Sequence, residues 1–186
     1  MQRLAFLLLS LVTTAILLAG PAKAINPQFD LLQAIERNEL DKVKDLLKKG
    51  TSPNTRSRTE GTPAILLAAR VANPAIMREL LDHGANPDLA GRERGLTALM
   101  VRATAGDEAM IKMLLEANAD PDKADIGQET ALMKAVRGRK FKAARLLLEA
   151  GADPNVQDLT GKSALEYARL SRSTRMIRLL EDAGAS

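Results

Sequence analysis

The 186-residue sequence has no cysteine and no tryptophan, and aromatic residues make up only 2% of it. The absence of cysteine excludes disulfide bonds, thiolate nucleophiles and cysteine metal ligands. With so few aromatic rings, a core has to be packed from aliphatic and alanine side chains, and an apolar fraction of 46% is sufficient for this. The length fits one domain of ordinary size.

Histidine is also scarce, and the groups that carry chemistry are missing. The single histidine, His83, stands at the end of a helical segment, where a surface role near the negative end of the helix is expected. The sequence has no Ser-His-Asp set, Cys-His pair or phosphate-binding loop. Asp120, Asp122 and Asp125 are spaced like the start of a calcium loop, but Asp125 and Ala131 fall where that loop needs Gly and Glu. We therefore expect solvated turn acids here, no cofactor, no metal and no enzymatic activity.

Neither sign of charge dominates. Lysine and arginine number 27 and aspartate and glutamate 23, a net charge of +4. Residues 1–24 contain Arg3 and Lys23 and no acid, so the remaining 162 residues carry 25 basic and 23 acidic side chains, a net of +2. Nucleic-acid binding depends on many uncompensated basic residues, so we expect no nucleic-acid partner.

The only long hydrophobic run lies at the start of the chain. Sixteen uncharged residues, Leu4–Ala19, follow Arg3 and precede Ala22-Lys23-Ala24, a pattern typical of a cleaved secretory signal peptide. An uncleaved membrane anchor is the alternative, although a span needs about 20 residues. We expect a signal peptide over 1–24, a short leader over 25–28, and an exported protein with no membrane attachment after cleavage. The lack of cysteine and of glycosylation sequons favours a bacterial periplasm, with secretion as the other possibility.

A repeat runs through the rest of the chain. A Gly or Asn follows a leucine pair at steps of 34, 34, 33 and 33 residues, at Gly50, Gly84, Asn118, Gly151 and Gly184. The starts of the units keep the same steps, at Phe29, Pro63, Thr97, Thr130 and Ser163. Self-similarity at this period predicts a stacked array of small units.

Each unit predicts two helices and a turn. The first segment is short and rich in alanine, as in TALMVRATA from Thr97, and its threonine is a good helix cap. The second, as in DEAMIKMLLEA from Asp107, has apolar residues at helical spacing. Gly or Asn then permits a left-handed stop, and Pro with Asp or Asn, as at Pro87-Asp88, favours a turn.

The TALM openings at Thr97 and Thr130 and the segment ARLLLEAGADPN, Ala144–Asn155, resemble the ankyrin repeat, and the resemblance covers residues 29–186. It implies an all-α repeat solenoid of five stacked helix-turn-helix repeats joined by β-hairpin-like fingers. The repeats are expected near 29–62, 63–96, 97–129, 130–162 and 163–186. The last repeat has Glu181 where the others have Leu47, Leu81, Leu115 and Leu148, as expected of a capping end.

The resemblance also implies a protein partner, bound by a concave surface made of the fingers and the first helices. Candidate positions in the fingers are Arg56, Arg58, Glu60, Arg92, Glu93, Arg94, Ala124, Ile126, Glu129, Gln157, Leu159, Thr160 and Lys162, and those at the helix ends are Arg70, Thr104, Arg137 and Leu170. Arginine pairs well with carboxylates, although solvated charged turns remain the alternative. The residues that we expect to contact a partner are Arg56, Arg58, Arg70, Arg92, Arg94, Arg102, Ile126, Arg137, Leu159 and Lys162.

Arg102 is unusual, because the equivalent positions of the other repeats hold Ala34, Ala68, Ala135 and Ala168. Its guanidinium must either reach a carboxylate inside the stack or project into the concave face. Replacement of Arg102 by alanine is expected to be neutral or stabilising if the side chain serves a partner, and destabilising if it serves the fold.

The sequence thus predicts a non-enzymatic protein–protein interaction module in the bacterial envelope, monomeric on its own. The alternative is an immunity-type or regulatory inhibitor of an exported toxin or enzyme. Both would use the same surface, so affinity and loss of the partner's activity distinguish them.

Overall fold

The structure, a computed structural model, describes residues 26–186. The expected signal peptide over 1–24 lies outside the described residues. Within them the chain forms ten α-helices. Their bounds are α1 Pro27–Glu36, α2 Leu40–Lys48, α3 Ala64–Val71, α4 Pro74–Asp82, α5 Ala98–Ala105, α6 Glu108–Glu116, α7 Ala131–Arg137, α8 Phe141–Glu149, α9 Ala164–Leu170 and α10 Thr174–Asp182.

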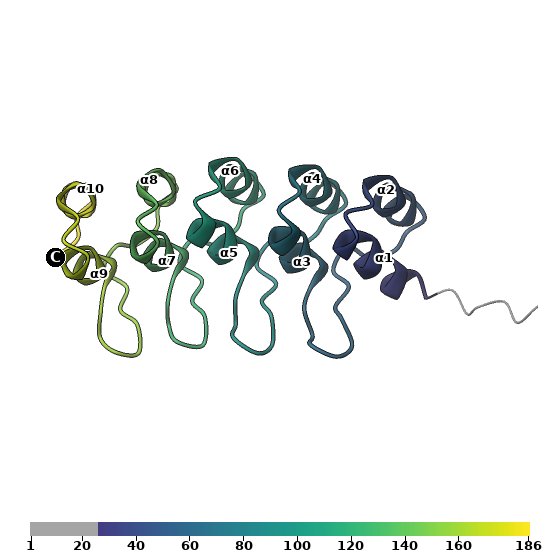
Figure 1. Cartoon of the computed structure of the whole chain (residues 1–186), viewed down its shortest axis with the longest axis horizontal. Helices are drawn as coiled ribbons and strands as arrows, with labels where there is room; N and C mark the ends of the chain where they lie inside the picture. Colours follow the sequence, from purple (N-terminus) through teal and green to yellow (C-terminus); the bar gives the residue numbers. More distant parts are fainter. Residues whose placement is uncertain (1–25) are drawn as a thin grey trace, which may run out of the picture.

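The helices form five pairs that stack side by side in one row (Figure 1). The first helix of each pair (α1, α3, α5, α7, α9) packs on the first helix of the next, and the second helices form a parallel row in which α2, α4, α6 and α8 pack on one another in turn. The loops that join the pairs extend from the first-helix row, away from the second helices (Figure 1). The predicted all-α repeat solenoid is confirmed.

The helix ends follow the local sequence. The hydroxyl of Thr97 accepts a hydrogen bond from the N–H of Met100, and Thr130 does the same for Met133. In the last repeat the Glu166 carboxylate accepts the N–H of Ser163, as in a capping box. The second helices are all followed by a residue with positive φ, the left-handed stop that the sequence predicted. These residues are Gly50, Gly84, Asn118, Gly151 and Gly184.

The first helix begins earlier than expected. α1 starts at Pro27, inside the segment 25–28 that we expected to be leader. The side chain of Asn26 accepts the N–H of Phe29, and a proline in the first turn brings a φ that already suits a helix. An Asn-Pro pair is therefore a helix start signal, and it acts here without the capping threonine found in later repeats.

One continuous core of aliphatic and alanine side chains runs through all five pairs. One position of the first helix is buried to within 1% in every repeat, and it holds Leu31, Ile65, Leu99, Leu132 and Leu165. A helix pair alone leaves such a position half covered, so the neighbouring repeat completes its burial. None of the helices in residues 26–186 has the length and apolarity that crossing a membrane requires.

Candidate functional site

Four loops, which we call fingers, project beside the first helices and form one face with them. They are finger 1 (57–62), finger 2 (91–96), finger 3 (125–129) and finger 4 (158–162). In each finger a backbone hydrogen bond of 2.9–3.1 Å joins the N–H of the first residue to the carbonyl of the last. Within the described residues the only β-bridge is isolated, between Arg56 and Pro63, so the fingers are hairpin-like turns without strands.

The fingers are of two kinds. Fingers 1 and 2 have six residues, and each tip is closed by a bond from the fifth residue to the first, as from Gly61 N–H to Ser57 O. Fingers 3 and 4 have five residues, and a bond from the fourth residue closes the tip, as from Gln128 N–H to Asp125 O. The change from 34-residue to 33-residue steps is therefore a change of turn within the fingers.

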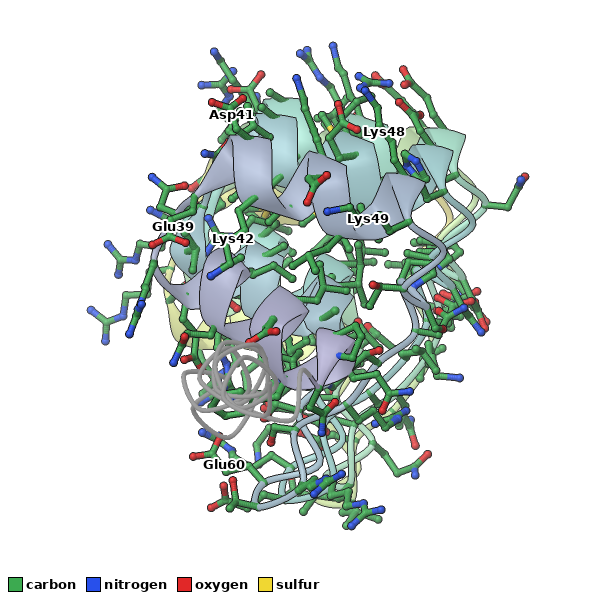
Figure 2. All side chains as sticks on the ribbon, turned by 90° about the vertical axis from the view of Figure 1, so that its right-hand side faces the viewer. Glu39, Asp41, Lys42, Lys48, Lys49 and Glu60 are labelled. Atoms are coloured by element: carbon green, nitrogen blue, oxygen red, sulfur yellow. The ribbon has the colours of Figure 1, made fainter. Side chains whose placement is uncertain are left out.

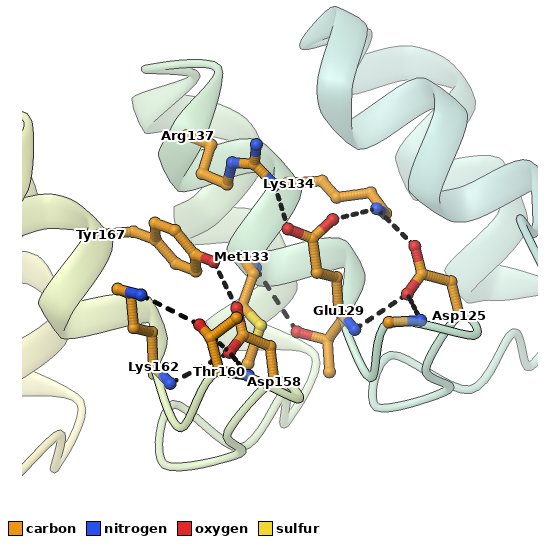
Figure 3. Close-up of polar contacts among 11 residues, drawn as sticks. Asp125, Glu129, Met133, Lys134, Arg137, Asp158, Thr160, Lys162 and Tyr167 are labelled. Carbon is orange, nitrogen blue, oxygen red and sulfur yellow. Dashed lines mark hydrogen bonds and ion pairs between the residues drawn. The ribbon is translucent and has the colours of Figure 1, made fainter. Parts of the chain in front are cut away.

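Finger 3 is held by a buried carboxylate. Asp125 is only 8% exposed, and its Oδ1 accepts the N–H groups of Gly127 at 2.8 Å and Glu129 at 3.0 Å. Its Oδ2 lies 2.7 Å from Nζ of Lys134 on α7 (Figure 3). The expectation of a solvated acid is wrong for Asp125, because the finger folds back over its carboxylate.

Finger 4 repeats the arrangement with other partners. Asp158 is also 8% exposed, and it accepts the N–H groups of Thr160 and Lys162 and the hydroxyl of Tyr167 on α9 (Figure 3). Asp125 and Asp158 are 33 residues apart, as are Lys134 and Tyr167. Sequence reasoning missed both contacts, although this double spacing was a usable signal.

The environment of these groups changes their acidity. Burial alone would raise the pKa of Asp125, but the Lys134 ammonium and the backbone N–H groups hold it below its ordinary value. Burial likewise opposes ionisation of Asp158, yet the Tyr167 hydroxyl and the finger's own donors hold the pKa of Asp158 well below its usual range. The same hydrogen bond to Asp158 raises the pKa of Tyr167. Both aspartates are therefore ionised when the fingers are folded.

Neighbouring charges in finger 3 are also paired. The carboxylate of Glu129 lies 2.7 Å from Nζ of Lys134 and forms an ion pair with the guanidinium of Arg137. The guanidinium of Arg137 also lies 5.2 Å from the centre of the Tyr167 ring. Arg137 is thus exposed on this face as expected, but its charge is already balanced within the chain.

Fingers 1 and 2 lack the carboxylate, since Ser57 and Gly91 stand at the equivalent positions. They are joined instead by Arg56, whose guanidinium donates to Gly61 O at 3.0 Å and to Ala90 O at 2.7 Å. Arg56 is half-buried, so the structure places this predicted contact residue between two fingers rather than on the surface.

The other predicted arginines of these fingers point outward. Arg58, Arg92 and Arg94 are exposed, and no carboxylate of the described residues lies within 4.0 Å of them. Arg70 at the end of α3 is exposed and lies 4.0 Å from the Glu60 carboxylate. Viewed along the stack, Glu60 lies near the tips of the fingers, at the opposite side of the molecule from the second helices (Figure 2).

Arg102 lies inside the stack. It is 8% exposed, its Nη1 is 3.7 Å from a carboxylate oxygen of Asp107, and its Nε has no hydrogen-bond partner. Asp107 also caps α6 by accepting the N–H of Met110. The guanidinium of Arg102 is therefore directed to a carboxylate of its own repeat rather than to the surface of the molecule.

Two rows of equivalent residues border the face. The tip row is the second residue of each finger, Arg58, Arg92, Ile126 and Leu159. The helix-end row lies near the ends of α3, α5, α7 and α9 and consists of Arg70, Thr104, Arg137 and Leu170, while α1 has Glu36 at the equivalent position. Between fingers and helices the surface is hollowed, with about 220 Å³ beside Leu66 and Arg92, about 520 Å³ beside Val101 and Thr104, and about 420 Å³ beside Lys162 and Leu170. We call this surface the finger face.

Lys162 is half-buried and its Nζ lies 3.0 Å from the Thr160 hydroxyl, so it stabilises finger 4 at the edge of the face. Ile126 and Leu159, by contrast, are 65% and 73% exposed. His83 is exposed, as predicted, with Nδ1 2.8 Å from the carbonyl of Glu79. Residues 26–186 contain no group of three or more His, Cys, Asp or Glu side chains arranged to hold a metal ion.

Comparison with known proteins gives the same repeat. A family model described as ankyrin repeats (3 copies) matches residues 31–125, which is slightly more than half of the chain. A second, described as ankyrin repeats (many copies), matches residues 114–168. No curated protein matches the chain.

Proposed function

The chain belongs to the ankyrin repeat family, and on this basis we propose that it is a non-catalytic binding protein that holds one partner protein on its finger face. Repeats of this family are generally protein–protein interaction modules. The proposal also includes the bacterial envelope as the place of action, and a monomer as the free state.

One observation carries the proposal. The described residues have four exposed large apolar side chains, and three of them, Ile126, Leu159 and Leu170, lie on the finger face. Exposed apolar side chains that gather on one side mark a contact surface. The unpaired arginines of fingers 1 and 2 lie on the same face and add the residue type that is most common, with aromatics, at the centres of interfaces.

A blocked face tests the proposal. Thr104 is exposed and lines the largest of the three hollows on the finger face, so Thr104→Trp fills the space that a partner would enter. Ala109 is exposed on α6 in the second-helix row, and Ala109→Trp is the matched control. We expect a protein that is captured from the source cells by the unchanged chain to be retained by Ala109→Trp and lost by Thr104→Trp. Equal capture by both variants would place the binding surface elsewhere.

The same partner separates an adaptor from an inhibitor. An inhibitor of an exported toxin or enzyme would abolish the activity of its partner at a one-to-one ratio, and an adaptor would leave that activity in place. Assay of the captured partner with and without the chain gives the answer.

The envelope location rests on the pattern of residues 1–24. Cleavage after Ala24 leaves a chain that starts at Ile25, and the mass of the protein from its own cells tests this. An intact mass would instead support the anchored form of the same protein.

A further inference from the structure

The tip row changes its chemistry halfway along the stack. Its first two members, Arg58 and Arg92, are cationic and its last two, Ile126 and Leu159, are aliphatic, although all four occupy the same position of their fingers. All four are exposed. A row of solvated turn residues has no reason to expose two large aliphatic side chains side by side, because each leaves apolar surface in water.

The fingers hold this row in a fixed order. The N–H of Ile126 bonds to Arg94 O at 3.3 Å, and the N–H of Leu159 bonds to Gly127 O at 3.0 Å. The stem of Arg92 crosses Gly61 so closely that an added Cβ there would lie 2.3 Å from Arg92 Cδ. The four side chains therefore project from linked fingers, with one step of the row per repeat.

The helix-end row also ends in an aliphatic residue, Leu170, which is 68% exposed. It begins with Arg70, and the equivalent residue of α1 before it is Glu36, an exposed acid. The middle of the face is neutral, since Asp125 and Glu129 together balance Lys134 and Arg137. Fingers 1 and 2 carry three arginines without an ion pair, Arg58, Arg92 and Arg94, against the two exposed acids Glu60 and Glu93, so their net charge is positive. Exposed aliphatic surface lies around Leu159 and Leu170.

We propose that the finger face recognises an extended protein segment in which acidic and aliphatic side chains are segregated, with the acids on fingers 1 and 2 and the aliphatic side chains on fingers 3 and 4. This inference rests on the proposed function and adds the chemistry of the partner. Carboxylates match the unpaired arginine forks, and aliphatic side chains cover Leu159 and Leu170. The neutral centre of the face accepts either an acidic or an aliphatic residue, and the order of the segment follows from the difference between the two ends of the face.

The repeat sets the spacing of such a segment. Helices packed side by side lie about 8–10 Å apart. A segment in the extended polyproline II conformation has three residues per turn and advances about 3.1 Å per residue, so every third side chain lies on one face at a spacing of about 9 Å. About every third residue of the segment therefore meets one repeat. A ten-residue peptide with aspartates first and fourth, leucines seventh and tenth and serines elsewhere matches the tip row, in either chain direction.

Two peptides of identical composition provide the test. The segregated peptide is the one described above, and the alternating peptide has Asp, Leu, Asp and Leu at the same four places. We expect the segregated peptide to bind the full chain at least about tenfold more tightly, which corresponds to about 1.4 kcal/mol. NMR of methyl-labelled protein is the measurement, because Ile126, Leu159 and Leu170 report the location as well as the affinity.

Charge reversal supplies the second arm. Arg58→Glu with Arg92→Glu is expected to weaken the segregated peptide about tenfold or more. The control pair, Arg78→Glu with Lys112→Glu, makes the same change of net charge at exposed positions of α4 and α6 and should leave the affinity unchanged. High salt should reduce the difference between the two variants.

Equal affinity for the two peptides, or no binding of either, overturns the inference. Methyl shifts with vesicles of anionic phospholipid, but not with the segregated peptide, would also overturn it and indicate a membrane surface. If Thr104→Trp abolishes capture of a partner protein, the proposed function is still supported in each of these cases. If Thr104→Trp leaves that capture unchanged, both the proposed function and this inference are overturned.

Discussion

At the scale of single residues, the charged side chains of the stack divide into those that hold the chain together and those that stay available. Arg56 and Arg58 are two residues apart, yet the first bonds the carbonyls of two fingers and the second has no carboxylate near it. Composition does not distinguish them, since the direction of each side chain follows from the path of the finger backbone. The arginine-rich fingers were therefore predictable and the role of each arginine was not.

Arg102 should limit stability rather than supply it. Its Nε is buried without a partner and its ion pair with Asp107 is long, at 3.7 Å. Replacement of buried ion pairs by apolar side chains is often neutral or stabilising. We expect Arg102→Met, which keeps the packed stem, to raise the free energy of unfolding by about 1 kcal/mol in urea denaturation.

Replacement of the other partner of the ion pair, Asp107→Asn, keeps a capping oxygen for α6 but leaves the charge of Arg102 without a neighbouring carboxylate. It should lower the free energy of unfolding by about 1–3 kcal/mol, and in the presence of Arg102→Met the loss should be smaller. A loss of stability in Arg102→Met instead would mean that the ion pair holds the fold.

Asp158 predicts how stability depends on acid. Its pKa in the folded chain lies below the value of an unfolded aspartate, about 3.9, so its stabilisation is complete above that value and is lost as the pH falls below about 4. Asp158→Asn should be less stable by about 1–3 kcal/mol at pH 7. Urea denaturation from pH 7 down to about pH 3 should show the difference from the unchanged chain narrowing below about pH 4.

The exposed carboxylate of Asp182, at the end of α10, gives the control substitution Asp182→Asn. It should alter stability by less than about 0.5 kcal/mol at pH 7. A deficit of Asp158→Asn that stayed constant at every pH would show that the carboxylate charge is not what the finger depends on.

At the scale of elements, the two kinds of finger show where sequence reasoning succeeds and where it fails. The left-handed stops at Gly50 and Asn118 were predictable, because few residue types tolerate that conformation. The turns at the finger tips were not predictable, because a finger that is one residue longer or shorter brings a different N–H group to the carbonyl that closes the tip. The early start of α1 at Pro27 was missed because the repeat period placed the start of the first unit at Phe29, and the Asn26-Pro27 cap was not used as a start signal.

Close approach between fingers makes Gly95 more demanding than other glycines of positive φ. Its φ is 68°, and an added Cβ would lie 3.0 Å from the backbone nitrogen of Ile126 and 3.3 Å from Cα of Asp125. Gly84 has a φ of 85° with nothing within 4 Å of such an atom. Alanine at Gly84 should cost about 1 kcal/mol for conformation alone, and alanine at Gly95 at least about 1 kcal/mol more.

Urea denaturation of Gly84→Ala and Gly95→Ala side by side measures the difference. The amide signals of Ile126 and its neighbours should move only in Gly95→Ala, since backbone atoms there have to shift. Equal losses of unfolding free energy in the two variants would mean that finger 3 can move away from finger 2 at no energetic cost, and the fixed order of the tip row would then lose its support.

At the scale of the whole molecule, the stack was the most predictable feature. One buried position repeats as Leu31, Ile65, Leu99, Leu132 and Leu165, and burial of that position needs a neighbouring repeat. The period therefore implied the architecture. The direction of the finger face was predictable only through the family, because the sequence pattern says which residues are free to vary and not what they touch.

The open end of the stack predicts the assembly state. Glu181 of α10, in the last helix pair that the structure describes, occupies the place where earlier repeats have leucine. It is exposed and its ion pair with Arg169 is 3.8 Å long, so the pair itself contributes less than about 1 kcal/mol. Glu181→Leu should therefore leave stability nearly unchanged, while extending the apolar leucine row to the open end.

We expect Glu181→Leu to self-associate in light scattering after size-exclusion chromatography, because a second copy can cover the new surface. Glu149→Leu, which replaces another exposed acid on α8 within the stack, should remain monomeric. Association of both variants, or of neither, would show that the charge at the open end does not keep the repeats from continuing into another copy.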